Sequence, residues 1–87
     1  MTIASWLLEI EAGRGRSVRA ALEVHPGIEC RSEARGTLVV LTETPPGDRS
    51  MGRVKEILSG VPGVRGADLV TAFEEDEPNA GALSPLA

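Results

Sequence analysis

Residues 18–28 read Val-Arg-Ala-Ala-Leu-Glu-Val-His-Pro-Gly-Ile, and residues 54–64 read Val-Lys-Glu-Ile-Leu-Ser-Gly-Val-Pro-Gly-Val. In each stretch, apolar residues recur at helical spacing and are followed by a Pro-Gly pair and an aliphatic residue. Proline cannot continue a helix and glycine relaxes the backbone at its end, so the pair stops the helix. The chain therefore contains the same helix–turn–strand unit twice.

The two predicted helices each present one apolar stripe. The first is expected to begin after an N-cap at Ser17, and the second after Asp48 or Ser50. The stripe of the first helix comprises Val18, Ala21, Leu22 and His25. The stripe of the second comprises Met51, Val54, Ile57, Leu58 and Val61.

Four strand-like segments surround these helices, at residues 4–11, 28–33, 37–43 and 64–73. The connection Ala34-Arg35-Gly36 suits a hairpin with glycine at positive φ. The resulting β-α-β-β-α-β order predicts an α+β, ferredoxin-like fold. Both crossovers should be right-handed, so a four-stranded antiparallel sheet would have two helices on one face. We expect residues 1–74 to form this single domain and residues 75–87 to be a disordered acidic tail.

The sheet face without helices is where function is expected. Alternation directs Leu69, Thr71 and Phe73 of the last strand inward, toward the helices. An apolar surface with an acidic rim, which Glu74 would join, is therefore expected on the other side. The candidate peptide-binding residues on that side are Leu7, Glu9, Val39, Leu41, Glu43, Asp68, Val70 and Ala72.

Composition excludes several classes of protein. The 87 residues are 41% hydrophobic with a net charge of −4, and the basic residues all lie between Arg14 and Arg65. Apolar runs are far shorter than the ~20 residues of a membrane helix, and no export leader is apparent, so we expect a cytoplasmic protein without membrane insertion. With Trp6 and Phe73 as the aromatic residues, a base-stacking nucleic-acid surface is not expected.

No catalytic constellation is visible. Cys30 and His25 are the only cysteine and histidine, which argues against a disulfide framework, a metal site or a catalytic dyad. Residues 13–16, Gly-Arg-Gly-Arg, precede a helix but lack the spacing of phosphate-binding loops. We therefore expect a protein that is not an enzyme and that needs no cofactor.

Three other interpretations remain open. The apolar surface could be a homodimer interface, because small sheets often self-associate. A small-ligand-binding regulatory module, similar to amino-acid-sensing domains, shares the predicted topology. An acylphosphatase-like enzyme would need an asparagine near an arginine loop, but Asn79 is the only asparagine and lies in the tail.

Several segments together resemble one known family. They are residues 5–8 (Ser-Trp-Leu-Leu), 25–30 (His-Pro-Gly-Ile-Glu-Cys), 36–41 (Gly-Thr-Leu-Val-Val-Leu), 61–64 (Val-Pro-Gly-Val) and 69–70 (Leu-Val), followed by the acidic tail. Over about residues 4–75, the chain resembles the NapD family of cytoplasmic chaperones for the periplasmic nitrate reductase catalytic subunit. The resemblance implies binding of the twin-arginine signal peptide of that subunit's precursor. It also implies that export is delayed until the molybdenum cofactor and iron–sulfur cluster are in place.

Overall fold

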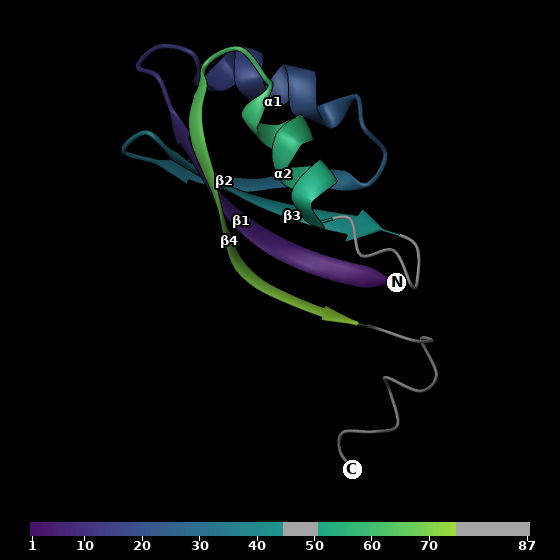
Figure 1. The fold of residues 1–87 in the computed structure, drawn as a ribbon. Helices are drawn as coiled ribbons and strands as arrows, with labels where there is room; N and C mark the ends of the chain where they lie inside the picture. The colour runs from purple at the N-terminus through teal and green to yellow at the C-terminus, as the bar shows by residue number, and fades with distance from the viewer. Residues whose placement is uncertain (45–50, 75–87) are drawn as a thin grey trace.

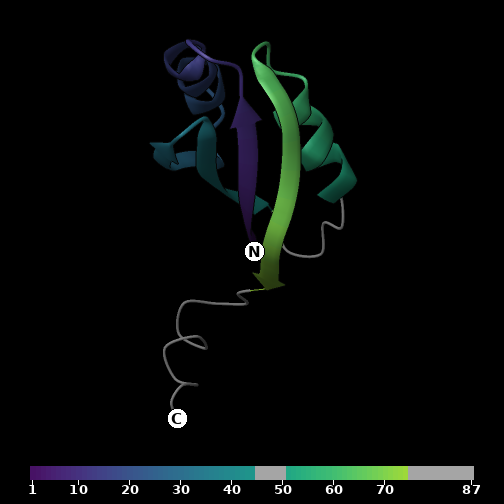
Figure 2. The same ribbon diagram turned by 90° about the vertical axis from the view of Figure 1, so that its left-hand side faces the viewer.

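A computed structural model of the chain describes residues 1–44 and 51–74, which form one antiparallel sheet and two helices (Figure 1). The elements are β1 (Thr2–Ile10), α1 (Gly15–Glu23), β2 (Ile28–Ala34), β3 (Thr37–Thr44), α2 (Met51–Ser59) and β4 (Val64–Glu74). The strand order across the sheet is β2-β3-β1-β4. Figures 1 and 2 show α1 and α2 on the same side of the sheet. The predicted ferredoxin-like arrangement is confirmed.

The two sequence repeats form equivalent turns. After α1, the Ile28 N–H donates to the His25 carbonyl oxygen at 3.1 Å, and after α2 the Val64 N–H donates to the Val61 carbonyl oxygen at 3.0 Å. Each Pro-Gly pair thus turns the chain directly from a helix into an edge strand of the sheet. The internal repeat correctly predicted two copies of one supersecondary unit.

The core lies between the helices and one face of the sheet. Alternate residues of β1 and β3 point into it, as their spacing predicted, and each helix contributes two buried residues separated by one turn. The buried apolar residues are Ala4, Trp6, Leu8, Ile10, Val18, Leu22, Leu38, Val40, Val54, Leu58 and Ala67. This packing against a single face holds the helices on that side.

Trp6 is the largest fully buried side chain and its indole has a polar partner. Its Nε1–H donates a hydrogen bond of 3.0 Å to Oγ1 of Thr42, which is also buried. Because Ala4 pairs with Thr42 and Trp6 with Val40, this bond runs diagonally from β1 to β3. The indole N–H can therefore be buried without an unsatisfied donor.

The ends of the predicted helices needed correction. α1 begins at Gly15, with Arg14 as N-cap, so Ser17 lies in the first turn and its hydroxyl donates to the Arg14 carbonyl oxygen at 3.1 Å. The helix ends at Glu23, which leaves His25 in the exposed turn rather than on the buried stripe. In α2, Ile57 is 40% exposed, because Val54 and Leu58 define the inward direction. The proposed caps at 48 and 50, and the predicted disorder of residues 75–87, lie outside the described residues.

β4 departs from regular alternation at Val70. Trp6 of β1 pairs with Leu69, but the preceding Ser5 pairs with Thr71, so Val70 is an extra residue in β4. Such a bulge shifts every later side chain to the opposite face. The prediction that Thr71 and Phe73 point toward the helices is therefore wrong.

The connection between β2 and β3 is a two-residue turn. Ala34 pairs with Thr37, and the central residues Arg35 and Gly36 both have positive φ, at 55° and 80°. The predicted positive φ of Gly36 is confirmed. Arg35 must also adopt the left-handed conformation for the turn to form. A residue with a Cβ is strained there, and hairpins of this kind favour Asn-Gly.

Removing the partner of Trp6 should destabilise the fold. Thr42→Val keeps the shape of the side chain but leaves a buried indole N–H unsatisfied, so the free energy of unfolding should fall by about 1–3 kcal/mol. Urea denaturation followed by Trp6 fluorescence measures this change. Thr71→Val, an exposed threonine of the same sheet, is the control and should change it by less than about 0.5 kcal/mol. Equal effects would contradict the role of the hydrogen bond.

Relieving the strain at Arg35 should stabilise the fold. Arg35→Asn places a residue that tolerates the left-handed region before Gly36, and should raise the free energy of unfolding by about 0.5–1 kcal/mol. Arg35→Gln removes the same charge without this tolerance and should give no gain. Thermal unfolding of both variants distinguishes backbone strain from charge, and a similar increase for Gln would refute the strain.

Candidate binding site on the open face of the sheet

We call the side of the sheet opposite α1 and α2 the open face. Its centre is formed by alternate residues of β1 and their partners on β3. From one end of β1 to the other, the cross-strand pairs are Ile3 with Glu43, Ser5 with Leu41, Leu7 with Val39, and Glu9 with Thr37. Because directly paired residues share a face, these eight side chains lie together. Leu7, Val39 and Leu41 are therefore placed as the sequence predicted.

β4 extends this face on the other side of β1. Asp68 lies opposite Leu7, which confirms its predicted direction. Beyond the bulge, Thr71 lies opposite Ser5 and Phe73 opposite Ile3. Phe73 therefore belongs to the open face.

Ala72 does not belong to the open face, contrary to the prediction. It pairs with Ala4, which is 1% exposed and faces the helices. Glu74 pairs with Thr2 on that same side, where it accepts a hydrogen bond from the Thr2 hydroxyl. The extra residue Val70 separates the two halves of β4, is 56% exposed and lies at the sheet edge. The bulge thus exchanges Ala72 for Phe73.

The apolar side chains of the open face form one cluster, which we call the apolar cluster. Leu7 is 40% exposed and Phe73 55% exposed, while the others are partly buried by their neighbours. Its members are Ile3, Leu7, Val39, Leu41 and Phe73. Contiguous exposed apolar patches are uncommon on monomeric proteins, and where they occur they commonly mark interaction surfaces.

Ile3 and Phe73 were missed by the sequence analysis for different reasons. Ile3 continues the alternation of Leu7 and Glu9, so extending the first predicted strand toward the N-terminus would have found it. Phe73 is displaced by a bulge that has no signature in the alternation of residues 64–73. Only the register between β1 and β4 reveals it.

Carboxylates surround the apolar cluster. Glu9, Asp68 and Glu43 lie on the open face, as predicted, and all three are exposed. The structure places Glu9 and Asp68 at one end of this face and Glu43 at the other. Glu29, opposite Leu41, adds a fourth, and its Oε2 accepts a bond of 2.9 Å from Arg31. Among the described ion pairs, none involves Glu9, Asp68 or Glu43. These carboxylates are therefore available to a basic partner.

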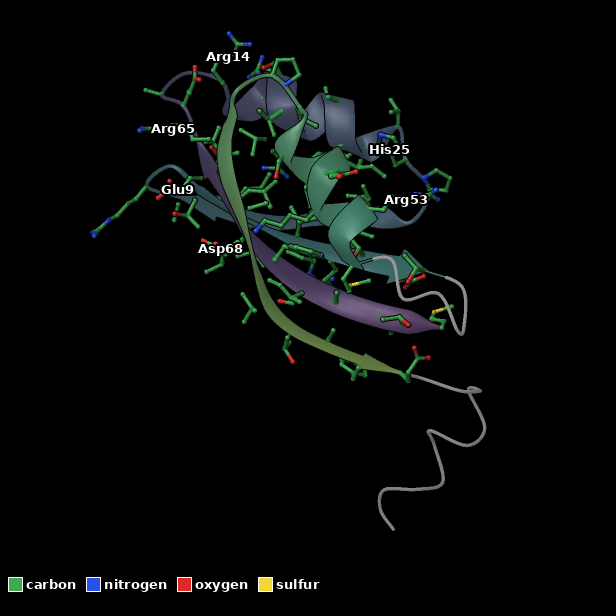
Figure 3. All side chains as sticks on the ribbon, in the orientation of Figure 1. Glu9, Arg14, His25, Arg53, Arg65 and Asp68 are labelled. Carbon is green, nitrogen blue, oxygen red and sulfur yellow. The ribbon has the colours of Figure 1, made fainter. Side chains whose placement is uncertain are left out.

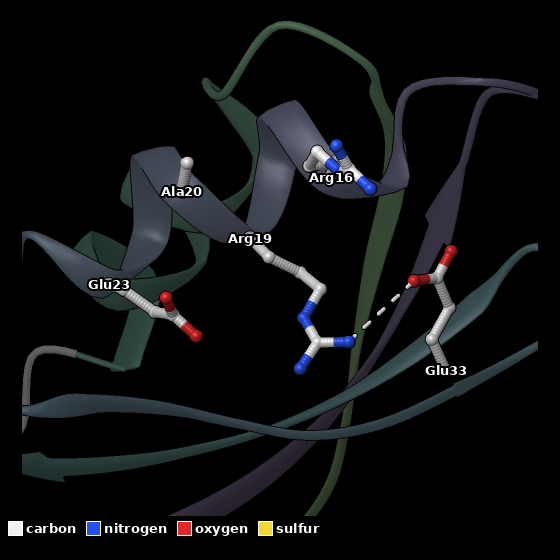
Figure 4. A pocket seen from close by; sticks show the side chains of 5 residues that line it. All are labelled: Arg16, Arg19, Ala20, Glu23 and Glu33. Atoms are coloured by element: carbon white, nitrogen blue, oxygen red, sulfur yellow. Dashed lines mark ion pairs between the residues drawn. The ribbon is translucent and has the colours of Figure 1, made fainter.

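The helix side has a different kind of concavity. A cavity of about 440 Å³ between α1 and β2 is lined by Arg16, Arg19, Ala20, Glu23 and Glu33 (Figure 4). Its charges partly compensate one another, since the Arg19 guanidinium lies 4.0 Å from the Glu33 carboxylate. That carboxylate also lies where a Cβ on Gly15 would be, at the start of α1. The side chain of Glu33 thus lies beside the first turn of α1, in which Gly15 and Arg16 of the Gly-Arg-Gly-Arg stretch take part.

Cys30 and His25 have structural surroundings. Cys30 packs against the edge of the core, where it pairs with the buried Val40 of β3. Burial raises the pKa of its thiol, and the neighbouring Glu23 adds to this effect while Arg19 opposes it. A thiol with a raised pKa is a poor nucleophile. His25 lies in the exposed turn after α1.

Residues 1–44 and 51–74 contain neither a cluster of metal ligands nor a membrane-spanning helix. In these segments, no group of three or more His, Cys, Asp or Glu side chains is placed to hold a metal ion. Within the same segments, neither helix has the length and apolar composition needed to cross a membrane.

Comparison with known proteins places this fold in a family. The model of the NapD protein family matches residues 1–76. Among solved structures, the chain is similar to the solution structure of the E. coli Tat proofreading chaperone protein NapD, with a TM-score of 0.70 and 22% sequence identity over 86% of this chain and 80% of that one. At this identity the similarity establishes the fold. The curated proteins include no significant match. The family match covers nearly all of the chain, which therefore belongs to the NapD family.

Proposed function

We propose that this protein is a cytoplasmic chaperone that binds the twin-arginine signal peptide of the periplasmic nitrate reductase catalytic-subunit precursor. By covering the peptide, it would delay export until the cofactors of that subunit are inserted. Membership of the NapD family and the similarity to a Tat proofreading chaperone support this proposal. The protein's part is binding, so the proposal needs neither a catalytic residue nor a cofactor of its own.

The open face is the observation on which the proposal depends. A signal peptide has a basic beginning followed by an apolar segment. The apolar cluster suits the second part. Glu9, Asp68 and Glu43, which have no partner among the described ion pairs, suit the first. The contacts made by Leu7, Val39, Leu41 and Val70 remain part of the proposal. Phe73, which lies on the open face, takes the place of Ala72 among the proposed contact residues.

The apolar surface is large enough for useful affinity. Covering about 300 Å² of it would contribute on the order of 7 kcal/mol before the entropy of association is subtracted. Electrostatic pairing at the rim would add specificity for a basic segment more than it would add affinity. The expected outcome is binding that is reversible, as a chaperone that must later release its client requires.

A charge placed within the apolar cluster should abolish binding. Leu41→Glu puts a carboxylate at the centre of the open face, where a bound apolar segment would have to desolvate it, so peptide affinity should be lost while the domain stays folded. Isothermal titration calorimetry with the precursor's signal peptide measures the affinity, and circular dichroism checks the fold. Leu7→Glu, at a position already 40% exposed, tests the same surface with less risk to folding.

The matched control is Val24→Glu, on a residue that is 74% exposed just after α1. It adds the same charge on the helix side and should leave the affinity unchanged. Unchanged affinity in both open-face variants would disprove this docking surface. Sedimentation of the free protein identifies the competing occupant, since a homodimer that uses this face would become monomeric in Leu7→Glu.

Salt should weaken the complex. The carboxylates of the open face are exposed, so their attraction to the peptide's arginines should be screened as the ionic strength rises from low to near-molar values. The measurement is the dissociation constant of the peptide across a salt series. A constant that does not change with salt would leave apolar contact as the sole source of binding.

A further inference from the structure

The open face is different at its two ends. At one end, Glu9 of β1 and Asp68 of the neighbouring strand β4 lie diagonally across from each other. Asp68 is opposite Leu7, and Glu9, two residues further along β1, is opposite Gly66. A Cβ added at Gly66 would meet nothing within 4 Å, so the space beside Glu9 is open. At the other end, Ile3 lies between Phe73 and Glu43, with Leu41 one step away. We call these the acidic end and the apolar end.

The two ends also differ in which carboxylates have no partner among the described ion pairs. Figure 3 shows Glu9 and Asp68 together on the side of the sheet away from His25 and Arg53. Two arginines also lie near the acidic end. Arg65 is a second extra residue of β4, between Val64, opposite Ile10, and Gly66, opposite Glu9. Arg35 lies in the β2–β3 turn. Among the described ion pairs, neither arginine contacts Glu9 or Asp68. Two neighbouring carboxylates are therefore available there. Toward the apolar end the described carboxylates are Glu43, which has no partner among the described ion pairs, and Glu29, which is paired with Arg31.

The distance between the ends limits the conformation of a bound segment. Ile3 and Glu9 are six positions apart on β1, which corresponds to about 20 Å at ~3.3 Å per residue. An extended segment would cross that distance with only about six residues. An α-helix, at 1.5 Å per residue, would cross it with about 13 residues. The apolar segments of signal peptides have about 7–15 residues, so the helix matches the face.

From this we infer the direction of the bound peptide, an inference that rests on the proposed function. We propose that the signal peptide lies on the open face as a helix running antiparallel to β1, with its arginine pair over Glu9 and Asp68 and its apolar segment extending past Leu7 to Ile3 and Phe73. The partial positive charge of the helix N-terminus would then also face the two carboxylates. Phe73 would be the aromatic anchor at the far end, the role that exposed aromatic side chains commonly have in interfaces.

Paramagnetic broadening tests the direction. Two versions of the precursor's signal peptide would carry a nitroxide amino acid, one beside the arginines and one at the end of the apolar segment. A label built into the peptide chain avoids exchange with the free thiol of Cys30. In the isotope-labelled protein, the first should broaden the amide signals of Glu9 and Asp68, and the second those of Ile3 and Phe73. The reverse pattern would overturn the proposed direction while leaving the proposed function intact.

A second measurement tests the arginine contacts. Glu9→Gln with Asp68→Asn should weaken peptide binding about three- to thirtyfold, as expected for two exposed ion pairs. The matched control, Glu43→Gln with Glu29→Gln, removes the same charge from the other carboxylates of this face and should have a smaller effect. A peptide with glutamines in place of the arginine pair should bind the wild type and Glu9→Gln/Asp68→Asn equally.

The possible results distinguish the arginine contacts from peptide binding itself. A larger effect in the control pair, or a persistent difference with the glutamine peptide, would overturn the arginine contacts but not peptide binding. Absence of any binding would overturn both the direction and the proposed function. Binding that leaves the amides of the open face unaffected would overturn the direction and this docking surface, but not the binding function.

Discussion

The two-residue period of β1, combined with helices on one side only, is the constraint on which the rest of this protein depends. Ala4, Trp6 and Leu8 are buried against α1 and α2, and the residues between them must therefore point the other way. Each residue of the central strand contributes either to stability or to the open face. Neither described helix crosses to that side, so within the described residues Leu7 and Phe73 remain 40% and 55% exposed there.

The bulge at Val70 determines what this surface contains. Without it, Ala72 would lie on the open face and Phe73 would point toward the helix side. With it, the chain's only phenylalanine lies next to Ile3 and extends the apolar cluster to the end of the sheet. The same bulge interrupts the regular pattern of an edge strand, which makes the edge a poorer template for uncontrolled pairing. One extra residue thus changes both the composition of the open face and the regularity of the sheet edge.

Charge is arranged differently on the two sides of the molecule. On the helix side, Arg19 and Glu33 form an ion pair across the cavity, and Glu33 lies at the start of α1. On the open face, Glu9, Asp68 and Glu43 have no partner among the described ion pairs. An exposed carboxylate is hydrated, so leaving it without an ion-pair partner destabilises the fold little, and it is free to bind a basic partner. This difference favours the sheet over the cavity as the place where a basic peptide binds.

The sequence by itself determined the order of elements, the inward and outward sets of β1 and β3, and the open-face direction of six of the eight candidate residues. These features depend on local periodicity and on Pro-Gly turns, which neighbouring residues specify. The start of α1, the orientation of Ile57, and the exchange of Ala72 for Phe73 were decided only by the tertiary structure. A bulge is a property of two paired strands, because the register of β4 is set by its hydrogen bonds to β1, far away in the chain. Alternation within β4 alone contains no record of that partner.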